Sequence, residues 1–223
     1  MISNNFLFRL ILVFLLSILS FSLPAQSKDS LTSDTPFRKG RWLTGLDGVI
    51  SSSTSEIAGV EGKTTSNQFG INISTGKFVK DRLLLGGAFQ AQRTSGSGNI
   101  NRATETLFIG PMGNYYLSNN SKGALFLQLS AGYVRYLDDT TVAQANSNVQ
   151  FESEGNGFGA IVGVGYSYVI NNRIAFDLAF NVNSFWINVD TETSDNMVLN
   201  ETITVSDTLF SFGFNVLLDD FFF

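Results

Sequence analysis

The sequence predicts an all-β protein, an eight-stranded antiparallel up-and-down transmembrane β-barrel, from three observations. Apolar side chains alternate with small or polar ones along eight segments. The connections between these segments alternate between long and short. The second face of each segment carries mainly Gly, Ala, Ser, Asn and Gln, where a solvated surface would carry charges. In a transmembrane barrel the apolar face meets lipid and the polar face lines the lumen.

The pattern is clearest over Asn67–Thr94, where two expected strands flank the polar turn Val79–Arg82. Phe69, Ile71 and Ile73 share one face of the first strand, and Gly, Asn and Ser share the other. Side chains of a strand alternate faces with period two, so each strand has one apolar face. A soluble periplasmic β-sandwich also alternates and is the competing fold. Only a closed barrel leaves no strand edge unpaired in lipid, and this requirement favours the barrel.

Composition excludes several classes of function. The chain has 223 residues, of which 43% are apolar and 15% charged, and its net charge is −5. A protein that binds nucleic acid needs a basic face, so no nucleic acid is expected as a partner. The chain contains neither Cys nor His. It therefore lacks thiolates, the commonest metal ligand and the usual general base, and we expect no catalytic residue, metal or cofactor.

The residues before the barrel are expected to direct export. Met1–Ala25 carries one positive charge, Arg9, ahead of the apolar run Leu10–Leu23. This organisation is typical of a secretory signal peptide, with the cleavage position open by two residues. The run is short for the ~20 residues of a spanning helix. Gln26–Lys39 is polar and is interpreted as a flexible lead-in, so the barrel domain covers residues 40–223.

The strands follow in order along the barrel domain. They are expected at Gly40–Ser53, in the two halves of Asn67–Thr94, and at Thr104–Leu117, Gly123–Asp138, Ser153–Ile170, from Ile174, and at Ile203–Leu218. Short turns are expected at Phe78–Arg82, Ser118–Lys122 and Asn171–Arg173. Long polar loops are expected at Thr54–Ser66, Ser95–Ala103, Asp139–Glu152 and Asp190–Glu201. Proline cannot donate to a strand ladder, so Pro111 predicts a bulge in the fourth strand.

The order of turns predicts the orientation of the barrel. Both ends of the barrel domain fall on the short-turn side, which is periplasmic in bacterial outer-membrane barrels. Aromatic residues near the strand ends suit interfacial girdles: Trp42, Phe78, Tyr115, Tyr133, Tyr168 and Trp186. The predicted location is the outer membrane, with periplasmic termini.

Charged residues on the inward face predict a polar network in the lumen, formed by Arg41, Asp47, Asp177 and Asp207. Arg41 and Asp177 fall near the short-turn end, where they could pair. A buried carboxylate without a partner is costly, so each acid should find one. A cation-conducting path is the alternative. An eight-stranded barrel has room only for side chains, so large inward residues favour a filled lumen: Leu84, Phe108, Met112, Tyr116 and Phe126.

Two further features concern ligands. Arg93 and Arg135 fall on the outward face near the long-loop ends, where they could contact lipopolysaccharide phosphates or remain solvated charges. Gly155–Ala160 has the spacing of a dinucleotide-binding turn, but a strand and not a helix follows it. These glycines are therefore expected in the barrel wall.

Three motifs resemble a known family. Gly76–Leu83, Ile109–Tyr116, and Gly163–Tyr168 with the Asn-Asn-Arg turn after it resemble the small eight-stranded outer-membrane β-barrels, the OmpA/OmpX-like barrel domain, particularly the stand-alone type of Bacteroidetes. The resemblance covers most of the mature chain. It implies an outer-membrane location and insertion by the barrel-assembly machinery, which reads a terminal aromatic residue that Phe223 matches. Asp219-Asp220 departs from the family pattern, because it leaves Phe223 out of phase with the last strand.

These features predict an integral outer-membrane protein with a structural or interaction role. It would contribute to membrane integrity and make surface contacts through four long polar loops. Outer-membrane lipids and lipopolysaccharide are the expected partners, and a monomer is the expected state. A narrow passive pore or a conduit for small or hydrophobic compounds is the alternative. Small barrels that act on lipids depend on His with Ser, so no enzyme is expected.

Overall fold

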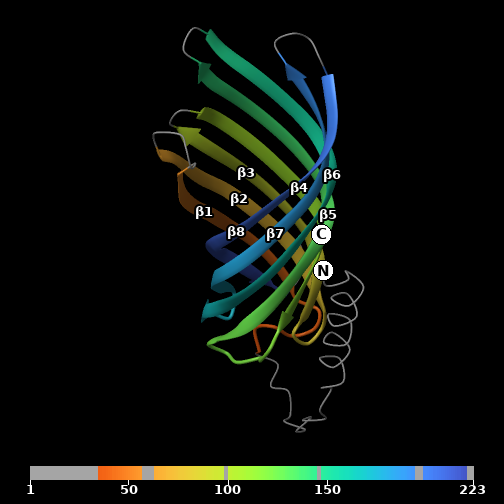
Figure 1. The fold of residues 1–223 in the computed structure, drawn as a ribbon. Helices are drawn as coiled ribbons and strands as arrows, with labels where there is room; N and C mark the ends of the chain where they lie inside the picture. Colours follow the sequence, from red (N-terminus) through yellow and green to blue (C-terminus); the bar gives the residue numbers. More distant parts are fainter. Residues whose placement is uncertain (1–34, 57–62, 98–99, 145–146, 194–197, 220–223) are drawn as a thin grey trace, which may run out of the picture. The chain divides into compact units, whose positions relative to one another are not determined.

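The computed structural model describes residues 35–56, 63–97, 100–144, 147–193 and 198–219, and its strands close into one barrel (Figure 1). The strands are β1 (Trp42–Glu56), β2 (Lys63–Lys80), β3 (Leu83–Ser97), β4 (Ile100–Tyr116), β5 (Gly123–Gln144), β6 (Ser147–Asn171), β7 (Ile174–Thr193) and β8 (Val198–Leu218). Each is antiparallel to its neighbours, and β1 pairs with β8. The predicted eight-stranded up-and-down barrel is confirmed. Over these ranges the search for a helix long and apolar enough to cross a membrane found none.

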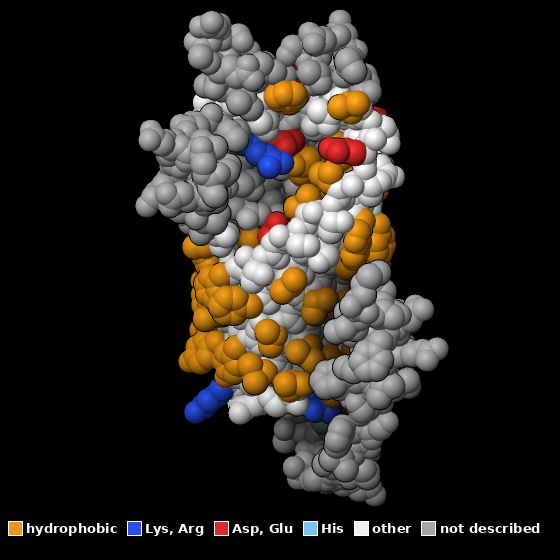
Figure 2. Space-filling view, in the orientation of Figure 1, with side chains coloured by type: hydrophobic (Ala, Val, Ile, Leu, Met, Phe, Trp, Pro, Cys, Tyr) orange, Lys and Arg blue, Asp and Glu red, His pale blue; other side chains and the backbone are white. Residues whose placement is uncertain are grey.

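The alternation of the sequence becomes the two faces of the wall. In β1, Leu43 and Val49 are buried in the lumen, whereas Leu46 is 58% and Ile50 is 53% exposed. The other strands divide in the same way, and Figure 2 shows hydrophobic side chains gathered as a band over the lower part of the visible face of the barrel. Apolar surface of this extent is stable against lipid and not against water. The band is therefore the lipid-facing surface.

Aromatic residues mark the edge of the band nearer the long connections. Tyr133, Phe158 and Trp186 are successive cross-strand partners on β5, β6 and β7, and the last two rings stack at 6.3 Å. Two residues farther along each strand, the outward side chains turn polar: Arg135, Asn156 and Asn188. This change places the lipid headgroups just beyond the aromatic row.

Basic and aromatic residues mark the short-turn edge. Lys77 Nζ lies 5.7 Å from the centroid of the Trp42 ring, and Arg82 Cζ lies 5.7 Å from that of Tyr115. Phe78, which was assigned to this girdle, instead points inward and is 1% exposed. The assignment was wrong because Phe78 shares the inward face of β2 and packs against other rings at the mouth.

The prediction of four long polar loops was wrong, because paired strands run through most of each segment. The pairing of β5 with β6 runs from Gly123 opposite Tyr168 up to Gln144 opposite Ser147. β7 and β8 stay paired up to Glu192–Val198. The polar sequences there are rich in Thr, Val and Ser, which suit strands, and beyond the membrane a strand needs no apolar face. Tall polar hairpins therefore replace the expected loops at this end (Figure 1).

The β1–β8 seam closes the barrel over the height of the apolar band. The paired residues run from Trp42 opposite Leu218 to Ile50 opposite Phe210. Beyond Ile50, β1 continues with β2 as far as Glu56, and beyond Phe210 the outward residues of β8 become polar: Thr208, Ser206 and Thr204. The seam ends where the lipid-facing surface ends. Water can satisfy strand edges beyond that point, which lipid cannot do.

The bulge predicted at Pro111 is absent from the described strand β4. The β4–β5 pairs step from Ile109–Tyr133 to Met112–Ser130 without a change of register. The Ser130 hydroxyl donates a hydrogen bond of 2.8 Å to the Pro111 carbonyl. This bond holds the two strands together at the place where proline has no N–H to offer, so no extra residue is needed.

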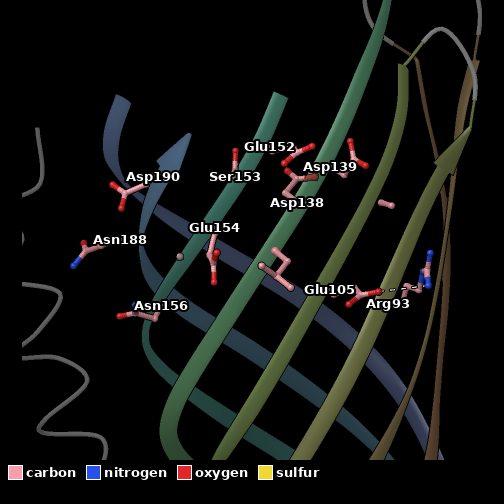
Figure 3. A pocket seen from close by; sticks show the side chains of 13 residues that line it. Arg93, Glu105, Asp138, Asp139, Glu152, Ser153, Glu154, Asn156, Asn188 and Asp190 are labelled. Atoms are coloured by element: carbon pink, nitrogen blue, oxygen red, sulfur yellow. Dashed lines mark ion pairs between the residues drawn. The ribbon is translucent and has the colours of Figure 1, made fainter. Parts of the chain in front are cut away.

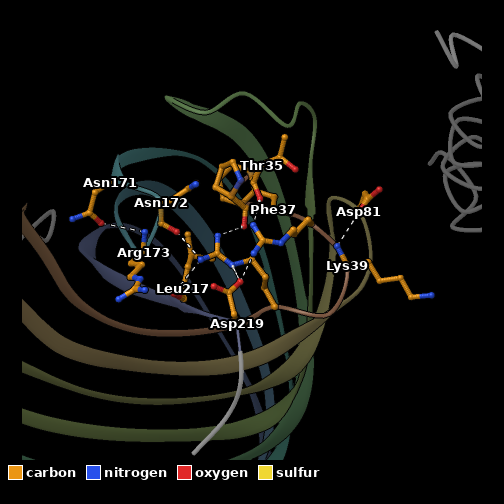
Figure 4. Close-up of polar contacts among 12 residues, drawn as sticks. Thr35, Phe37, Lys39, Asp81, Asn171, Asn172, Arg173, Leu217 and Asp219 are labelled. Carbon is orange, nitrogen blue, oxygen red and sulfur yellow. Dashed lines mark hydrogen bonds and ion pairs between the residues drawn. The ribbon is translucent and has the colours of Figure 1, made fainter. Parts of the chain in front are cut away.

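The chain just before β1 closes the short-turn mouth of the barrel (Figure 4). Phe37 is fully buried, and its ring stacks on Tyr116 with centroids 4.1 Å apart. Its N–H donates to Asn119 Oδ1 at 3.2 Å, and its carbonyl accepts from the Arg82 N–H at 2.8 Å. The end of the expected flexible lead-in, residues 35–39, is thus held in place here. The predicted signal peptide lies outside the described residues, as does Phe223.

Replacing Phe37 by Ala tests this closure. The substitution removes a buried ring from the mouth, and we expect a loss of about 3–5 kcal/mol in the free energy of unfolding, as is typical of buried Phe-to-Ala changes. Urea unfolding of the barrel in lipid vesicles, followed by tryptophan fluorescence, measures it. Phe37→Leu serves as the control and should lose much less. Equal stability of Phe37→Ala and the unchanged protein would contradict a packed mouth.

Candidate functional site

Large side chains fill the lumen. The fully buried ones include Phe37, Leu43, Phe78, Leu84, Phe108, Tyr116, Tyr136 and Phe185. Near the short-turn end, Tyr116 packs against Phe126 with ring centroids 5.6 Å apart. Phe126 fits because Gly165 faces it on β6, where an added Cβ would lie 2.5 Å from the Phe126 ring. The filled lumen predicted from the inward aromatic residues is therefore present in this part of the barrel.

Arg41 lies at the short-turn mouth and not in the middle of the lumen. Its Nε forms an ion pair with Asp219 Oδ1 at 3.0 Å. Its guanidinium also donates to the carbonyl oxygens of Pro36, Asn172 and Leu217, at 3.1, 2.6 and 3.3 Å. Burial lowers the pKa of this guanidinium, and the charge of Asp219 opposes that shift. Arg41 therefore ties the lead-in, the β6–β7 turn and the end of β8 together.

The suggested pair between Arg41 and Asp177 is not formed. Asp177 lies opposite Gly213, which is also the partner of Asp47 on β1. Asp47 is six residues beyond Arg41, or roughly 20 Å along a strand at about 3.3 Å per residue. The correct partner, Asp219, follows β8 at the level of the mouth. Sequence alternation identified the face of each residue but not the height at which opposite strands meet.

Asp47 and Asp177 come together inside the barrel. Both line a small cavity of about 20 Å³, together with neutral polar side chains and Phe126. Asp47 Oδ2 accepts a hydrogen bond of 3.0 Å from Asn72 Nδ2. Asp177 Oδ1 is buried and has no hydrogen-bond partner among the described residues. The polar network predicted for the lumen is thus centred on these two acids.

Asp207 lies apart from that pair, toward the long hairpins. It is half-buried on β8 opposite Asn183, and Gln68 is its other polar neighbour. Gln68 in turn donates to Gln92 Oε1 at 3.0 Å. The four charges proposed as one network therefore occupy three places: Arg41 at the mouth, Asp47 with Asp177 in the lumen, and Asp207 above them.

Arg93 and Arg135 lie on the outer face just beyond the apolar band, and each is paired with an acid. Arg93 Nη1 is 3.4 Å from Glu105 Oε1, and Arg135 Nη2 is 2.9 Å from Glu154 Oε1. All four side chains are at least half exposed. Both arginines lie on the outward face near the long connections, as the alternation indicated, and the contact with lipopolysaccharide stays a prediction. Exposed ion pairs of this kind are weak, so another anion could compete with the two glutamates.

A groove of about 820 Å³ lies above the band on β3 to β7 (Figure 3). Its charged lining is mostly acidic. Arg93 is basic, and the acidic residues are Glu105, Asp138, Asp139, Glu152, Glu154 and Asp190. The long-hairpin end is therefore acidic, whereas the short-turn rim is basic. Within the described ranges, no three acidic side chains are close enough together to hold a metal ion.

Sequence reasoning missed a polar cluster on the inner side of the hairpins. The Arg102 guanidinium donates to Asp138 and, at 2.9 Å, to Tyr136 OH. Tyr136 OH donates to Asp138 Oδ2 at 3.1 Å, and Thr104 Oγ1 donates to Asp138 Oδ1 at 3.3 Å. Arg102 fell in a predicted loop. Its period-two spacing from Thr104 and Phe108 was the signal that it continues the inward face.

Comparison with known proteins gives likeness of structure only. No family model matches the chain, and no curated protein sequence does. Among solved structures, the outer membrane protein OprG from Pseudomonas aeruginosa is similar with a TM-score of 0.50 and 15% identity, over 83% of this chain and 99% of that one. A major outer membrane protein from Thermus thermophilus is similar with a TM-score of 0.50 and 9% identity, over 80% and 99% of the two chains.

The outer membrane protein AlkL is a third such structure, with a TM-score of 0.50 and 13% identity over 82% of this chain and 92% of that one. Identities this low carry information about the fold and not about ligands or activity. The structural similarity agrees with the closed eight-stranded ring. The chain has the fold of the small OmpA/OmpX-like outer-membrane β-barrels.

Proposed function

We propose that the chain is a closed, non-conducting protein of the outer membrane, whose role is structural and interactive. The observation that carries this proposal is the filled lumen. Phe37 and Tyr116 block the short-turn mouth, and the cavity around Asp47 and Asp177 measures only about 20 Å³. That volume holds about one water molecule. Continuous passage of a solute would require large side chains to move.

The tall hairpins are the part of the molecule suited to contact other molecules. They rise beyond the apolar band, their outward side chains just above it include Arg135, Asn156 and Asn188, and they carry the acidic groove. In outer-membrane barrels the longer connections face outward and the short turns face the periplasm. By this rule the hairpins lie on the cell surface and the termini lie in the periplasm. The proposed state is a monomer, inserted by the barrel-assembly machinery with Phe223 as its signal.

A narrow pore, or a conduit for small or hydrophobic compounds, is the competing function. It requires a continuous path through the level of Tyr116 and Phe126, which the packed rings occupy. Catalysis is not part of the proposal, because the chain has no His, which is the usual general base.

Conductance across a planar bilayer tests the closed lumen. The refolded protein should give no steady nanosiemens-scale openings. Phe37→Ala combined with Tyr116→Ala and Phe126→Ala removes three rings from the mouth and the narrow part of the lumen, so this variant should conduct. Phe180→Ala, which alters a lipid-facing ring, is the control and should stay silent. Steady openings by the unchanged protein would favour the pore over the closed barrel.

Lipopolysaccharide is the proposed lipid partner at the hairpin end. Arg93 and Arg135 lie just beyond the aromatic row, at the height of lipid phosphates, and their exposed ion pairs contribute only ~0.2–1 kcal/mol each. A phosphate that bridges them could exchange for Glu105 and Glu154 at little cost. The proposal rests on this placement and on the charge of the two side chains.

Removing both arginines tests this contact. Arg93→Gln with Arg135→Gln should weaken binding of purified lipopolysaccharide to the detergent-solubilised barrel about tenfold, which corresponds to ~1.4 kcal/mol. Microscale thermophoresis at two salt concentrations measures it. Lys77→Gln with Lys80→Gln removes the same charge from the opposite rim and is the matched control. Equal weakening in both variants would show that net charge, and not this site, is responsible.

A further inference from the structure

The lumen holds two carboxylates that face each other across one strand. Asp47 on β1 and Asp177 on β7 are both register partners of Gly213 on β8. A Cβ on Gly213 would lie 2.2 Å from Asp47 Oδ1. The Asp47 carboxylate therefore lies over the glycine, on the side of Asp177. Glycine at this position is what lets the two acids approach one cavity.

The cavity between them is polar and has the size of one ion. Its volume is about 20 Å³, close to the space needed for a single water-sized species. Besides the two acids, its lining includes Asn72 and Asn114. Asn114 is 6% exposed, and among the described residues neither its Oδ1 nor Asp177 Oδ1 has a hydrogen-bond partner. The polar neighbours of these two groups are neutral: Tyr116 lies beside Asn114, and Ser167 and Asn215 lie beside Asp177. The two buried oxygen atoms are therefore open to a cation.

Among the residues that the structure describes, no basic side chain lines this cavity. The buried Arg41 is held at the mouth by Asp219 and three carbonyl oxygens. Asn72 gives Asp47 one neutral hydrogen bond. Buried charge is costly unless an opposite charge compensates it. Two charged carboxylates inside a wall surrounded by lipid are therefore costly until a cation or protons neutralise them, and the lining side chains supply no positive charge.

We propose that this cavity binds one calcium-sized divalent cation between Asp47 and Asp177, with Asn114 Oδ1 as a further ligand. The available ligands are oxygen atoms, which hard cations prefer, and two carboxylates balance a charge of +2. Ca²⁺ takes about six to eight oxygen ligands in irregular sets. The lining offers further oxygen atoms from Ser74, Gln128 and Asn215 besides the carboxylates and Asn114. Mg²⁺ demands near-ideal octahedral geometry and usually keeps several of its own waters, so this small irregular cavity suits it less. Because the short-turn mouth is closed, the ion is taken up as the barrel folds.

Refolding with and without calcium tests the site. The full-length mature chain is refolded in EDTA, in CaCl₂ or in MgCl₂, and its unfolding temperature is read from the heat-dependent shift in gel mobility. We expect CaCl₂ to raise this temperature by several degrees and MgCl₂ to raise it less. Inductively coupled plasma mass spectrometry of the desalted, folded protein should find one Ca²⁺ per chain.

The matched variants separate this site from the acidic hairpins. Asp47→Asn with Asp177→Asn should fold, bind no Ca²⁺ and lose the response to CaCl₂. Asp207→Asn, a luminal acid outside the cavity, should keep both. Wild-type protein without bound Ca²⁺ would overturn the proposal, as would a double variant that still responds. Stabilisation by acid alone, with no effect of CaCl₂, would also overturn it, because protons would then neutralise the pair. None of these results depends on whether the barrel conducts.

Discussion

The structure depends on the backbone pairing that joins β1 to β8. Lipid offers no hydrogen bonds, so a sheet that crosses it must leave no edge, and closure meets that requirement. The seam pairs end at Ile50–Phe210, where the outward side chains of β8 change from Phe to Thr and Ser. The extent of closure thus follows the extent of the lipid-facing band. Beyond it the strands continue as hairpins that water can solvate.

Closure with eight strands has a consequence for function, because it leaves a lumen only as wide as its own side chains. Glycines on the inner face make room for rings on the facing strands, as Gly165 does for Phe126. The lumen is then packed like a protein core, and among the described residues it keeps a small polar cavity at Asp47 and Asp177. A barrel packed in this way suits contacts at its surface and the binding of an internal ion. It does not suit bulk transport.

The candidate site was predicted in part. Period-two alternation placed Asp47, Asp177 and Asp207 on the inward face, and it placed Arg93 and Arg135 outside, because a side chain's face follows from its position in the strand. It did not show that Arg41 pairs with Asp219. Nor did it show that Arg102 continues an inward row within a segment expected to be a loop. Both depend on which residues of separate strands share a height, and a single strand carries no such information.

The sequence by itself determined the number of strands, their direction, the face of each residue and the apolar band. These features arise from local alternation and from turn residues, which act within one strand or hairpin. Only the tertiary structure decided the stagger between strands, the length of the paired hairpins and the folding of Phe37 into the mouth. These depend on closing the ring, a condition that couples β1 to β8 and is met only when the whole chain is in place.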